Sequence, residues 1–413
     1  MDKVQSQIKP RSLQVIFRKT RERGLSWAMT RGWEIAYGRA SRVLQDVNSI
    51  VRRTIGFWVW LFPGLLFLLR QAPPSEKRIL AIWDFRSQPY SIGDLLILQE
   101  ISLALCHRYG VSSVDVCLLA EPHEPSRPSF SALNVNSNNY MEFIVSLIPV
   151  ILAGRHIAEL HFFDSHVKLE RYIADNTYRY HIWPSGLKYA TRKDLNHLSF
   201  VFLTEFYKKY QFLPSLAFRP ALIDWAKSFL GRHAVPNVPI VVQLRNAGEY
   251  NPFRNSKMDS WIELFRYCEE RFPVRFIIIC AKAEVDERLR YLSNVIVAKD
   301  FDTTIDQDLA LIQCAAAYMG MSSGPSTVAS FGSKPYSIIN AYFDDLPANV
   351  VTKYSWGGSF AFANEHQRLL RGAETPELLK DEFFRLFSAI DVMSWQLLSP
   401  ISAPSDNVPL RLR

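Results

Sequence analysis

From about residue 78 onward, short apolar runs alternate with longer segments in which apolar residues recur every three to four positions. The short runs have the length of buried strands, and the longer segments have the period of amphipathic helices. This alternation predicts mostly parallel sheets with helices on both faces. In the first half, the predicted strands are 78–85, 113–120, 157–163 and 178–183, and the predicted helices are 94–108, 141–153, one from 165, 195–210 and 220–233.

Two prolines within Val235–Pro239 interrupt the alternation, which then restarts, so a domain boundary is predicted there. We expect an α/β fold with two doubly wound, Rossmann-like domains over 78–235 and 236–374, and a closing helix with a loose tail over 375–413. Two such sheets would face a cleft, where ligands bind at the carboxyl ends of the strands. The second half has predicted strands at 240–244, 274–281, 295–298, 317–321 and 336–340, and predicted helices at 259–271, 284–292, 306–316 and 375–398.

Residues 1–77 have a different composition. Residues 1–53 contain twelve Lys or Arg against four Asp or Glu, which accounts for the formal charge of +8 of the whole chain. The remainder is formally neutral, so we expect no nucleic-acid partner, because nucleic-acid enzymes usually spread basic charge along the binding cleft. Residues 11–53 are predicted to be helical, with aromatic and aliphatic residues among the basic ones. This pattern is typical of a helix that binds an anionic membrane surface. A solvated helical hairpin packed on the body is the alternative.

An uninterrupted apolar run follows at Ile55–Leu69, flanked by Arg52, Arg53 and Arg70. It is shorter than the roughly 20 residues that span a bilayer and is broken by Pro63 and Gly64. We interpret residues 1–77 as a membrane-associating segment that attaches the protein, peripherally or monotopically through residues 11–70, to the cytoplasmic face of a membrane. A true span and a buried core helix are the alternatives for the apolar run. The five scattered cysteines form no Cys-x-x-Cys pair, which fits buried thiols in a reducing compartment.

The first candidate for chemistry is the stretch Ala315–Asn340. It predicts a strand at 317–321, a tight polar turn at 322–325 and a short helix that begins at Ser326. A small-residue turn before a helix leaves backbone N–H groups beside the positive end of the helix dipole, which favours a phosphate. An ordinary strand–helix–strand crossover with a good cap is the alternative.

The second candidate is the segment Tyr90–Leu96, directly after the first predicted strand of the first domain. Asp94 would lie at the start of a helix on the rim of the cleft, where a carboxylate can act as a general base. The alternative is a plain helix cap, because Asp is a preferred capping residue.

These segments make the chain resemble the GT-B glycosyltransferases, in particular the bacterial heptosyltransferase-like group. Ser91-Ile92-Gly93-Asp94 matches that group's Ser-x-Gly-Asp, whose Asp is taken as the base that activates the acceptor hydroxyl. The resemblance implies that Arg86, Tyr90, Ser91 and Gly93 lie on the acceptor side.

The second mark of this group is Asp-Thr-Gly-x-x-His-x-Ala, which faces the diphosphate of the donor. Here the segment Ser322–Ala329 continues into Phe331–Pro335, which resembles the group's aliphatic-Gly-x-Pro. Ser322 replaces the usual Asp and Thr327 the usual His, which leaves the donor sugar open. The resemblance implies donor-binding roles for Ser322, Ser323, Gly324, Ser326 and Thr327.

The third mark is a basic loop after the first strand of the second domain. Arg245, Asn246, Arg254 and Lys257 could neutralise a departing nucleoside diphosphate, the role that a metal has in other glycosyltransferases. Solvated loop charge is the alternative. Asp306-Gln307-Asp308 matches a metal-binding Asp-x-Asp string but lies at a predicted helix start, where acids are usual.

A second group of possible metal ligands, His156, His161 and His166 with Asp164, has no standard ligand spacing. We therefore expect no metal and no cofactor.

The resemblance implies an inverting, metal-independent glycosyltransferase, and the composition of residues 1–77, which lie outside the resemblance, adds membrane association. Its partners would be a nucleotide-sugar donor, a lipid-linked or cell-envelope glycan acceptor and an anionic membrane surface. Two alternatives stay open: a sugar-nucleotide epimerase of the same architecture, and a catalytically silent relative that serves as a membrane-bound scaffold.

Overall fold

The computed structural model describes residues 77–86, 88–121, 135–184, 195–248, 252–341, 343 and 346–390. All described residues belong to one compact unit within 75–413. The predicted membrane-associating segment up to residue 76 and the tail after residue 390 lie outside the described residues. Within the described part of the chain, none of the helices has both the length and the apolar character needed to cross a bilayer.

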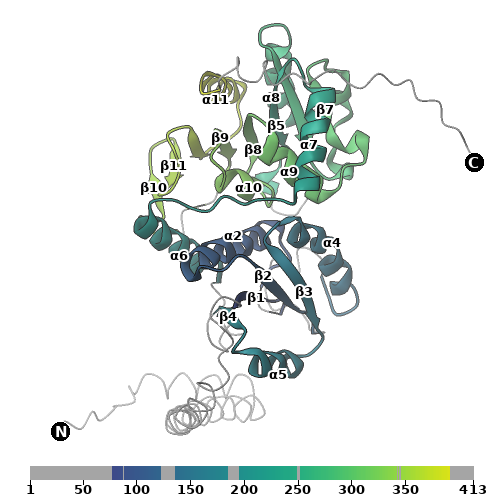
Figure 1. Ribbon diagram of the computed structural model, residues 1–413. Helices are drawn as coiled ribbons and strands as arrows, with labels where there is room; N and C mark the ends of the chain where they lie inside the picture. The colour runs from purple at the N-terminus through teal and green to yellow at the C-terminus, as the bar shows by residue number, and fades with distance from the viewer. Residues whose placement is uncertain are drawn as a thin grey trace, which may run out of the picture. The chain divides into compact units, whose positions relative to one another are not determined.

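The first domain is built on a four-stranded parallel sheet with strand order β3-β2-β1-β4 (Figure 1). The strands β1 and β2 are buried along most of their length, as expected for a sheet between helical layers. The strands are β1 (Arg78–Asp84), β2 (Val114–Leu119), β3 (Ile157–Phe163) and β4 (Tyr180–Trp183), and the helices are α2 (Ile92–Tyr109), α4 (Tyr140–Ala153), α5 (His166–Asn176), α6 (Leu195–Tyr210) and α7 (Pro220–His233).

The second domain contains an eight-stranded sheet in the order β10-β11-β12-β9-β8-β5-β6-β7. Its six parallel strands, counted in chain order, lie in the order 3-2-1-4-5-6 of a Rossmann fold. The strands are β5 (Val238–Gln243), β6 (Val274–Ile279), β7 (Val295–Val297), β8 (Ala317–Met321), β9 (Tyr336–Ile339), β10 (Val351–Lys353), β11 (Gly357–Phe360) and β12 (Gln367–Leu370). The helices are η3 (Pro252–Arg254), α8 (Met258–Glu269), η4 (Lys282–Glu284), η5 (Glu287–Tyr291), η6 (Ala298–Phe301), α9 (Ile305–Cys314), α10 (Ser326–Ser330) and α11 (Pro376–Ser388).

Local capping signals set several helix ends. The Ser91 side chain caps α2, and Gly110 ends that helix with a left-handed φ of 67°. Thr304 and Gln307 form a capping box at the start of α9. Thr375 caps α11, and Pro376 occupies its first turn. These signals are local, so the sequence placed the starts of these three helices to within two residues. The predicted extension of the last helix toward residue 398 is wrong, because α11 ends at Ser388.

The α/β class and the two Rossmann-like sheets are confirmed, with two corrections in the second domain. The α-helix predicted at 284–292 is wrong, because η4 and η5 are separate 3₁₀ segments. Between them the Asp286 carboxylate accepts the backbone N–H of Arg288 at 2.9 Å, a local bond that competes with an α-helical turn. The antiparallel ribbon of β10 and β11 beside β12 is absent from the prediction, since its strands have three to four residues.

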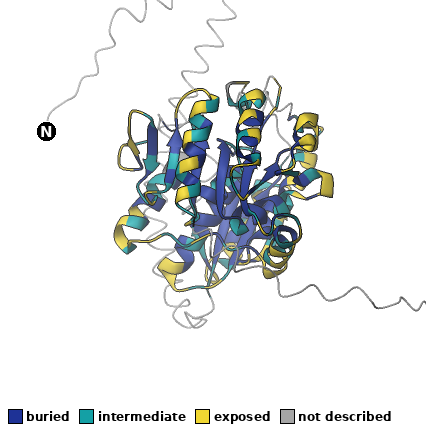
Figure 2. Ribbon diagram, turned by 90° about the horizontal axis from the view of Figure 1, so that it is seen from above, coloured by how far each residue is buried: buried dark blue, intermediate teal, exposed yellow. Residues whose placement is uncertain are grey.

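The two domains share apolar contacts. One cluster of buried side chains includes residues of β1 and α2 together with residues of α9, β8 and β9. Helix α7, which the sequence assigns to the first domain, contacts α9 of the second, and α4 contacts α9 as well. Figure 2 shows the central strands as buried and the outer turns of the helices as exposed. The apolar contacts therefore extend from one sheet to the next.

A tight backbone contact joins β5 to β8. Gly320 lies opposite Gln243 in the register, and a Cβ atom at Gly320 would lie 2.5 Å from the Gln243 carbonyl oxygen. We predict that Gly320→Ala lowers the free energy of unfolding by about 1–3 kcal/mol, because the added methyl overpacks the sheet. Gly231→Ala is the matched control: a Cβ atom there meets nothing within 4 Å, so it should stabilise α7 by up to about 1 kcal/mol. Urea unfolding measures both, and an unchanged midpoint for Gly320→Ala would contradict the contact.

Candidate functional site

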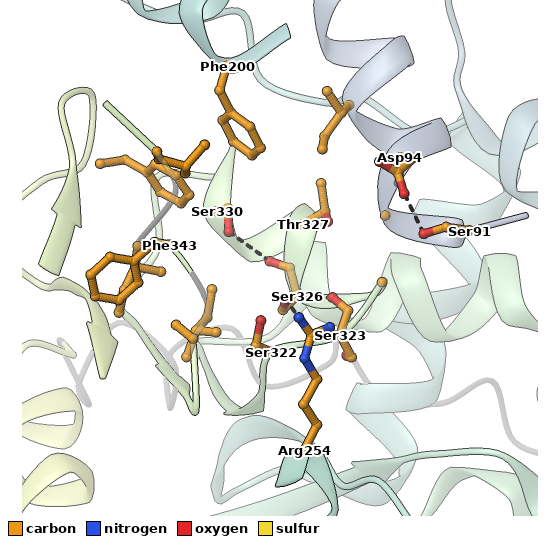
Figure 3. A pocket seen from close by; sticks show the side chains of 18 residues that line it. Ser91, Asp94, Phe200, Arg254, Ser322, Ser323, Ser326, Thr327, Ser330 and Phe343 are labelled. Carbon is orange, nitrogen blue, oxygen red and sulfur yellow. Dashed lines mark hydrogen bonds between the residues drawn. The ribbon is translucent and has the colours of Figure 1, made fainter. Parts of the chain in front are cut away.

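A pocket of about 210 Å³ lies where the start of α2 meets the turn after β8 (Figure 3). One part of its wall is polar, and the other is apolar and aromatic. The polar residues are Ser91, Asp94, Arg254, Ser322, Ser323, Ser326, Thr327 and Ser330. The remaining wall is formed by Gly93, Ile97, Phe200, Gly324, Ile338, Ala341, Phe343, Leu346, Phe360 and Leu369.

Asp94 lies in the first turn of α2 and lines this pocket. The cap of the helix is Ser91, whose Oγ accepts the backbone N–H of Asp94 at 3.4 Å. The alternative interpretation of Asp94 as the helix cap is therefore wrong. The Asp94 carboxylate is half-buried, and Figure 3 shows it on the pocket side of α2, across from Thr327.

The two domains touch through glycine backbone at this point. A Cβ atom at Gly324 would lie 2.7 Å from the Ile92 Cβ and 3.0 Å from the Gly93 nitrogen. A Cβ atom at Gly93 would lie 3.1 Å from the Thr327 Oγ1 and 3.2 Å from the Gly324 Cα. The Ser-x-Gly-Asp segment of the first domain and the polar turn of the second thus meet at van der Waals distance, which only glycines permit.

Four of the backbone N–H groups in and after the turn at 322–325, which the sequence predicts to be free, are bonded to protein oxygens. The N–H of Ser322 bonds to the Ile339 carbonyl at 2.9 Å, and that of Ser323 bonds to the Ser326 Oγ at 3.3 Å. The N–H groups of Ser326 and Thr327 bond to carbonyls within the turn. Helix α10 has only five residues, so its dipole is small. The prediction of a backbone phosphate cradle is wrong for these four N–H groups, and the turn presents hydroxyls instead.

The turn is anchored at the topological switch point of the second sheet. β5 and β8 are adjacent parallel strands whose neighbours lie on opposite sides, and Ser322 follows directly after β8. The Ser323 hydroxyl donates to the Gln243 side-chain oxygen at the end of β5. Ligands of Rossmann folds bind where the carboxyl ends of two such strands diverge. The pocket therefore has the location that the fold favours for a ligand.

The basic loop after β5 contributes one cation to the pocket. Arg254, at the end of η3, directs its guanidinium toward Ser322 and Ser323 (Figure 3). Arg245 is 9% exposed, and its Nη1 donates to the Asn255 Oδ1 at 3.3 Å.

The other two residues of the basic loop, Asn246 and Lys257, are exposed. Like Arg245, they are not among the described lining residues of the pocket. Their predicted donor contacts stay predictions.

Of the four residues predicted on the acceptor side, two line the pocket and two do not. Ser91 and Gly93 line the pocket. Arg86 instead forms two bonds to Asp84, at 3.0 and 2.8 Å, and one to Glu121 at 2.6 Å. Tyr90 is 6% exposed and stacks on Phe85 with ring centroids 4.8 Å apart. Arg86 and Tyr90 thus support the end of β1 beside the site, and their predicted acceptor contacts stay predictions.

The sequence prediction did not include the apolar wall. Phe200 comes from α6 and stacks on Phe360 of β11 at 5.4 Å with an interplanar angle of 7°. Phe343 and Leu346 come from the segment after β9. No signal in the sequence joins these positions, because the ribbon that carries Phe360 has no recognisable strand pattern. Ser330 is one turn after Ser326 in α10 and could have been found from that spacing.

One of the candidate metal ligands, Asp308, is engaged with protein groups. Asp308 is 3% exposed, forms a 2.7 Å ion pair with Lys299 and accepts the Thr303 hydroxyl at 2.6 Å. The Asp-x-Asp string therefore belongs to the first turn of α9, where acidic residues are usual. His156 is buried, and this burial lowers its pKa to about 4.

One described group of side chains has metal-ligand spacing. The ligand atoms of His161, Asp115 and Glu159 lie within 4.8 Å of one another. The Arg78 guanidinium lies between the two carboxylates, at 3.2 and 2.9 Å, so a cation from the protein already pairs with both and offsets one of their two negative charges.

Comparisons with known proteins give similarity of fold only. No protein-family model matches the chain, and no curated protein matches it. Among solved structures, it is similar to the ADP-heptose LPS heptosyltransferase II of E. coli, with 14% identity, a TM-score of 0.45 and coverage of 76% of this chain and 99% of that one. It is similar to a glycosyl transferase family 9 protein of Veillonella parvula, with 10% identity, a TM-score of 0.45 and coverage of 78% and 92%. It is also similar to the E. coli heptosyltransferase WaaC with ADP, with 11% identity, a TM-score of 0.41 and coverage of 74% and 99%.

The strand orders describe the architecture independently of these matches. Two Rossmann-like domains that share a pocket beside the switch point of the second sheet form a GT-B-like arrangement.

The contact between the domains gives a test. We predict that Gly324→Ala separates the start of α2 from the turn at 322–325, because the added Cβ would lie 2.7 Å from the Ile92 Cβ. Hydrogen exchange of the amides at 92–95 should be faster by about tenfold, which corresponds to roughly 1.4 kcal/mol. Gly332→Ala, whose Cβ would lie 3.3 Å from its nearest neighbour, is the control. Equal exchange in the two variants would show that the glycine contact does not hold the domains together.

Proposed function

We propose that the protein is a GT-B glycosyltransferase that acts in cell-envelope glycan synthesis. It would transfer a sugar from a nucleotide-sugar donor to a lipid-linked or glycan acceptor. One observation carries the proposal: a single pocket has a carboxylate from the first domain, Asp94, and a guanidinium with several hydroxyls from the second. That is the pairing of a base with an anion-binding group that glycosyl transfer to a hydroxyl requires.

The proposed reaction is a single displacement. The acceptor hydroxyl loses its proton to the Asp94 carboxylate and attacks the anomeric carbon of the donor sugar. The bond between that carbon and the diphosphate oxygen breaks, and its electron pair leaves with the nucleoside diphosphate. Attack opposite to the leaving group inverts the anomeric configuration, as the resemblance implies. Asp94 and Arg254 are on different domains, so a sugar between them would have its two reacting faces toward the base and the leaving-group site.

Arg254 would stabilise the charge on the leaving diphosphate. A guanidinium forms bidentate, charge-assisted bonds to phosphate, and the hydroxyls of Ser322 and Ser323 lie beside it. We propose that the guanidinium of Arg254, and not a metal ion, provides the positive charge that stabilises this leaving group.

The dimensions of the pocket limit what it can hold. Its volume of about 210 Å³ is below the roughly 300–1,000 Å³ typical of sites for drug-sized ligands. We propose that it holds the donor sugar and the adjoining phosphate. The nucleoside would then lie toward the loop after β5, which contains Arg245, Asn246 and Lys257. Neutral Ser322 and Thr327 would contact the sugar or phosphate through hydroxyls.

We further propose that residues 1–77 hold the enzyme at the cytoplasmic face of a membrane, where lipid-linked acceptors are found. The composition of these residues supports this proposal: a charge of +8 over residues 1–53, followed by the apolar run Ile55–Leu69. Co-sedimentation of the full chain with anionic vesicles, compared with neutral vesicles, tests it.

A donor screen separates a transferase from a silent scaffold. Thermal unfolding of the full chain is followed with UDP, GDP, CMP, dTDP and ADP sugars. A donor at about 100 times its dissociation constant should stabilise the protein by roughly 2.7 kcal/mol. Stabilisation by one nucleotide family, followed by sugar transfer to an acceptor, supports the proposal. Binding without transfer to any envelope acceptor would favour the scaffold, and turnover without an acceptor would favour an epimerase.

We predict that Asp94→Asn lowers kcat by about 10²–10⁴-fold and leaves donor affinity within a factor of about three, because the amide cannot accept the proton. Transfer of radiolabelled sugar and donor titration measure the two quantities. Asp306→Asn is the matched control, since it removes a carboxylate from the first turn of α9, outside the pocket. Full transfer by a folded Asp94→Asn protein would exclude Asp94 as the base.

We predict that Arg254→Gln weakens binding of the nucleoside diphosphate product by about tenfold or more, which corresponds to roughly 1.4 kcal/mol. Isothermal titration with the diphosphate identified in the screen measures this. The control is Arg271→Gln, which removes a charge that packs on the Tyr267 ring in the same domain. Equal affinities of both variants would place the diphosphate elsewhere.

A further inference from the structure

A second cavity, larger than the candidate site, lies at the opposite edge of the second sheet. Its volume is about 660 Å³, within the range of sites that hold small organic ligands. Pro239 near the start of β5, Cys314 before β8 and Lys334 before β9 line it, so it lies at the amino ends of these strands. The candidate active site lies at their carboxyl ends. The two cavities are therefore separate binding spaces.

One face of α7 forms much of the wall. Ile223, Lys227, Leu230 and Gly231 follow the i, i+4, i+7, i+8 spacing of a single helix face, and all four line the cavity. Gly231 leaves open space, because a Cβ atom there would meet nothing within 4 Å. Most of the remaining wall is apolar as well: Ala217, Phe218, Val235, Pro239 and Cys314.

The charged side chains of the wall have one sign. Arg155, Lys227 and Lys334 line the cavity, and the described lining contains no carboxylate. The Lys334 Nζ donates to the Ala315 carbonyl, and burial lowers the pKa of this ammonium to about 8. Asp224 is an acidic group near Cys314, but it does not line the cavity. Lys334 and Lys227 are also near Cys314, and their positive charges act against the negative charge of Asp224. The cavity thus combines an apolar wall with an excess of positive charge.

An exposed apolar helix face ends beside this cavity. Met141, Val145 and Leu152 of α4 are 40%, 55% and 38% exposed, although they are large apolar residues. The end of α4 is bonded to the segment that lines the cavity: the N–H of Arg155 bonds to the Ala217 carbonyl at 2.9 Å, and the N–H of Arg219 bonds to the Ala153 carbonyl at 2.8 Å. An apolar surface and a cationic, apolar cavity are therefore adjacent.

We propose that this cavity binds an anionic amphiphile, a molecule with a phosphate or carboxylate head and an aliphatic chain. The head would bind Arg155, Lys227 and Lys334, and the chain would pack along Ile223, Leu230 and the space at Gly231. Charge complementarity favours the anion, and the apolar wall favours the chain. The proposal concerns a site apart from the candidate active site and does not rest on the proposed glycosyl transfer.

The test is isothermal titration of the full chain with octyl phosphate. Gly231→Phe should weaken binding at least tenfold, because its side chain enters the open space, while Gly231→Ala should bind like the original protein. Lys227→Glu should also weaken binding by about tenfold, and Lys168→Glu on α5, an exposed lysine away from the cavity, should leave it unchanged. Binding to any other part of the chain is common to the two Gly231 variants and cancels between them.

Two further probes identify which part of the ligand is recognised. Inorganic phosphate tests the head alone, and 1-octanol tests the chain alone; both should bind at least tenfold more weakly than octyl phosphate. Equal affinity for either probe would overturn the amphiphile. Equal octyl phosphate binding by Gly231→Phe and Gly231→Ala would overturn the location. If Gly231→Phe does not fold, Lys227→Glu tests the location of the site. Lys227 is exposed, so this substitution should be tolerated, and full affinity of Lys227→Glu for octyl phosphate would exclude the cavity.

Discussion

The rest of the site depends on one steric constraint, the contact of glycine backbone between the two domains. At Gly93 and Gly324, a Cβ atom would lie within about 3 Å of the opposite domain. Because neither residue has a side chain, the first turn of α2 reaches the turn after β8, and Asp94 enters the same pocket as Ser322 and Arg254. The base candidate and the anion-binding candidate thus come from separate Rossmann units, and their spacing is set by the packing of the two domains. Any change in that packing alters the chemistry as well as the stability.

Several charged side chains outside the pocket are engaged with one another. Arg86 is held by Asp84 and Glu121, and Lys299 by Asp308. Arg78 pairs with both Asp115 and Glu159. Of these pairs, Lys299–Asp308 has both side chains largely buried, and a buried pair of this kind mainly fixes geometry. Asp94 and Arg254 line the pocket, so their charges lie where a ligand would bind.

The two edges of the second sheet have different chemistry. The carboxyl ends of β5 and β8 present hydroxyls and one guanidinium, which suits a polar, phosphorylated ligand. The amino ends of the same strands border an apolar cavity with three cations, which suits an anionic amphiphile. Both arrangements follow from the contacts between domains: α2 approaches one edge, and α4 and α7 approach the other.

The sequence alone determined the α/β class, the two strand–helix domains, most element positions and the two segments that form the polar part of the pocket. These depend on periodicity, capping and turn residues, which are local. Only the tertiary structure decided that the N–H groups of Ser322 and Ser323 are bonded to protein oxygens. It also decided that Arg254 rather than Arg245, Asn246 or Lys257 lines the pocket, and that Phe200 and Phe360 form an aromatic wall. Each of these outcomes depends on contacts between residues distant in sequence, and a local pattern contains no information about which surfaces the two domains bring together.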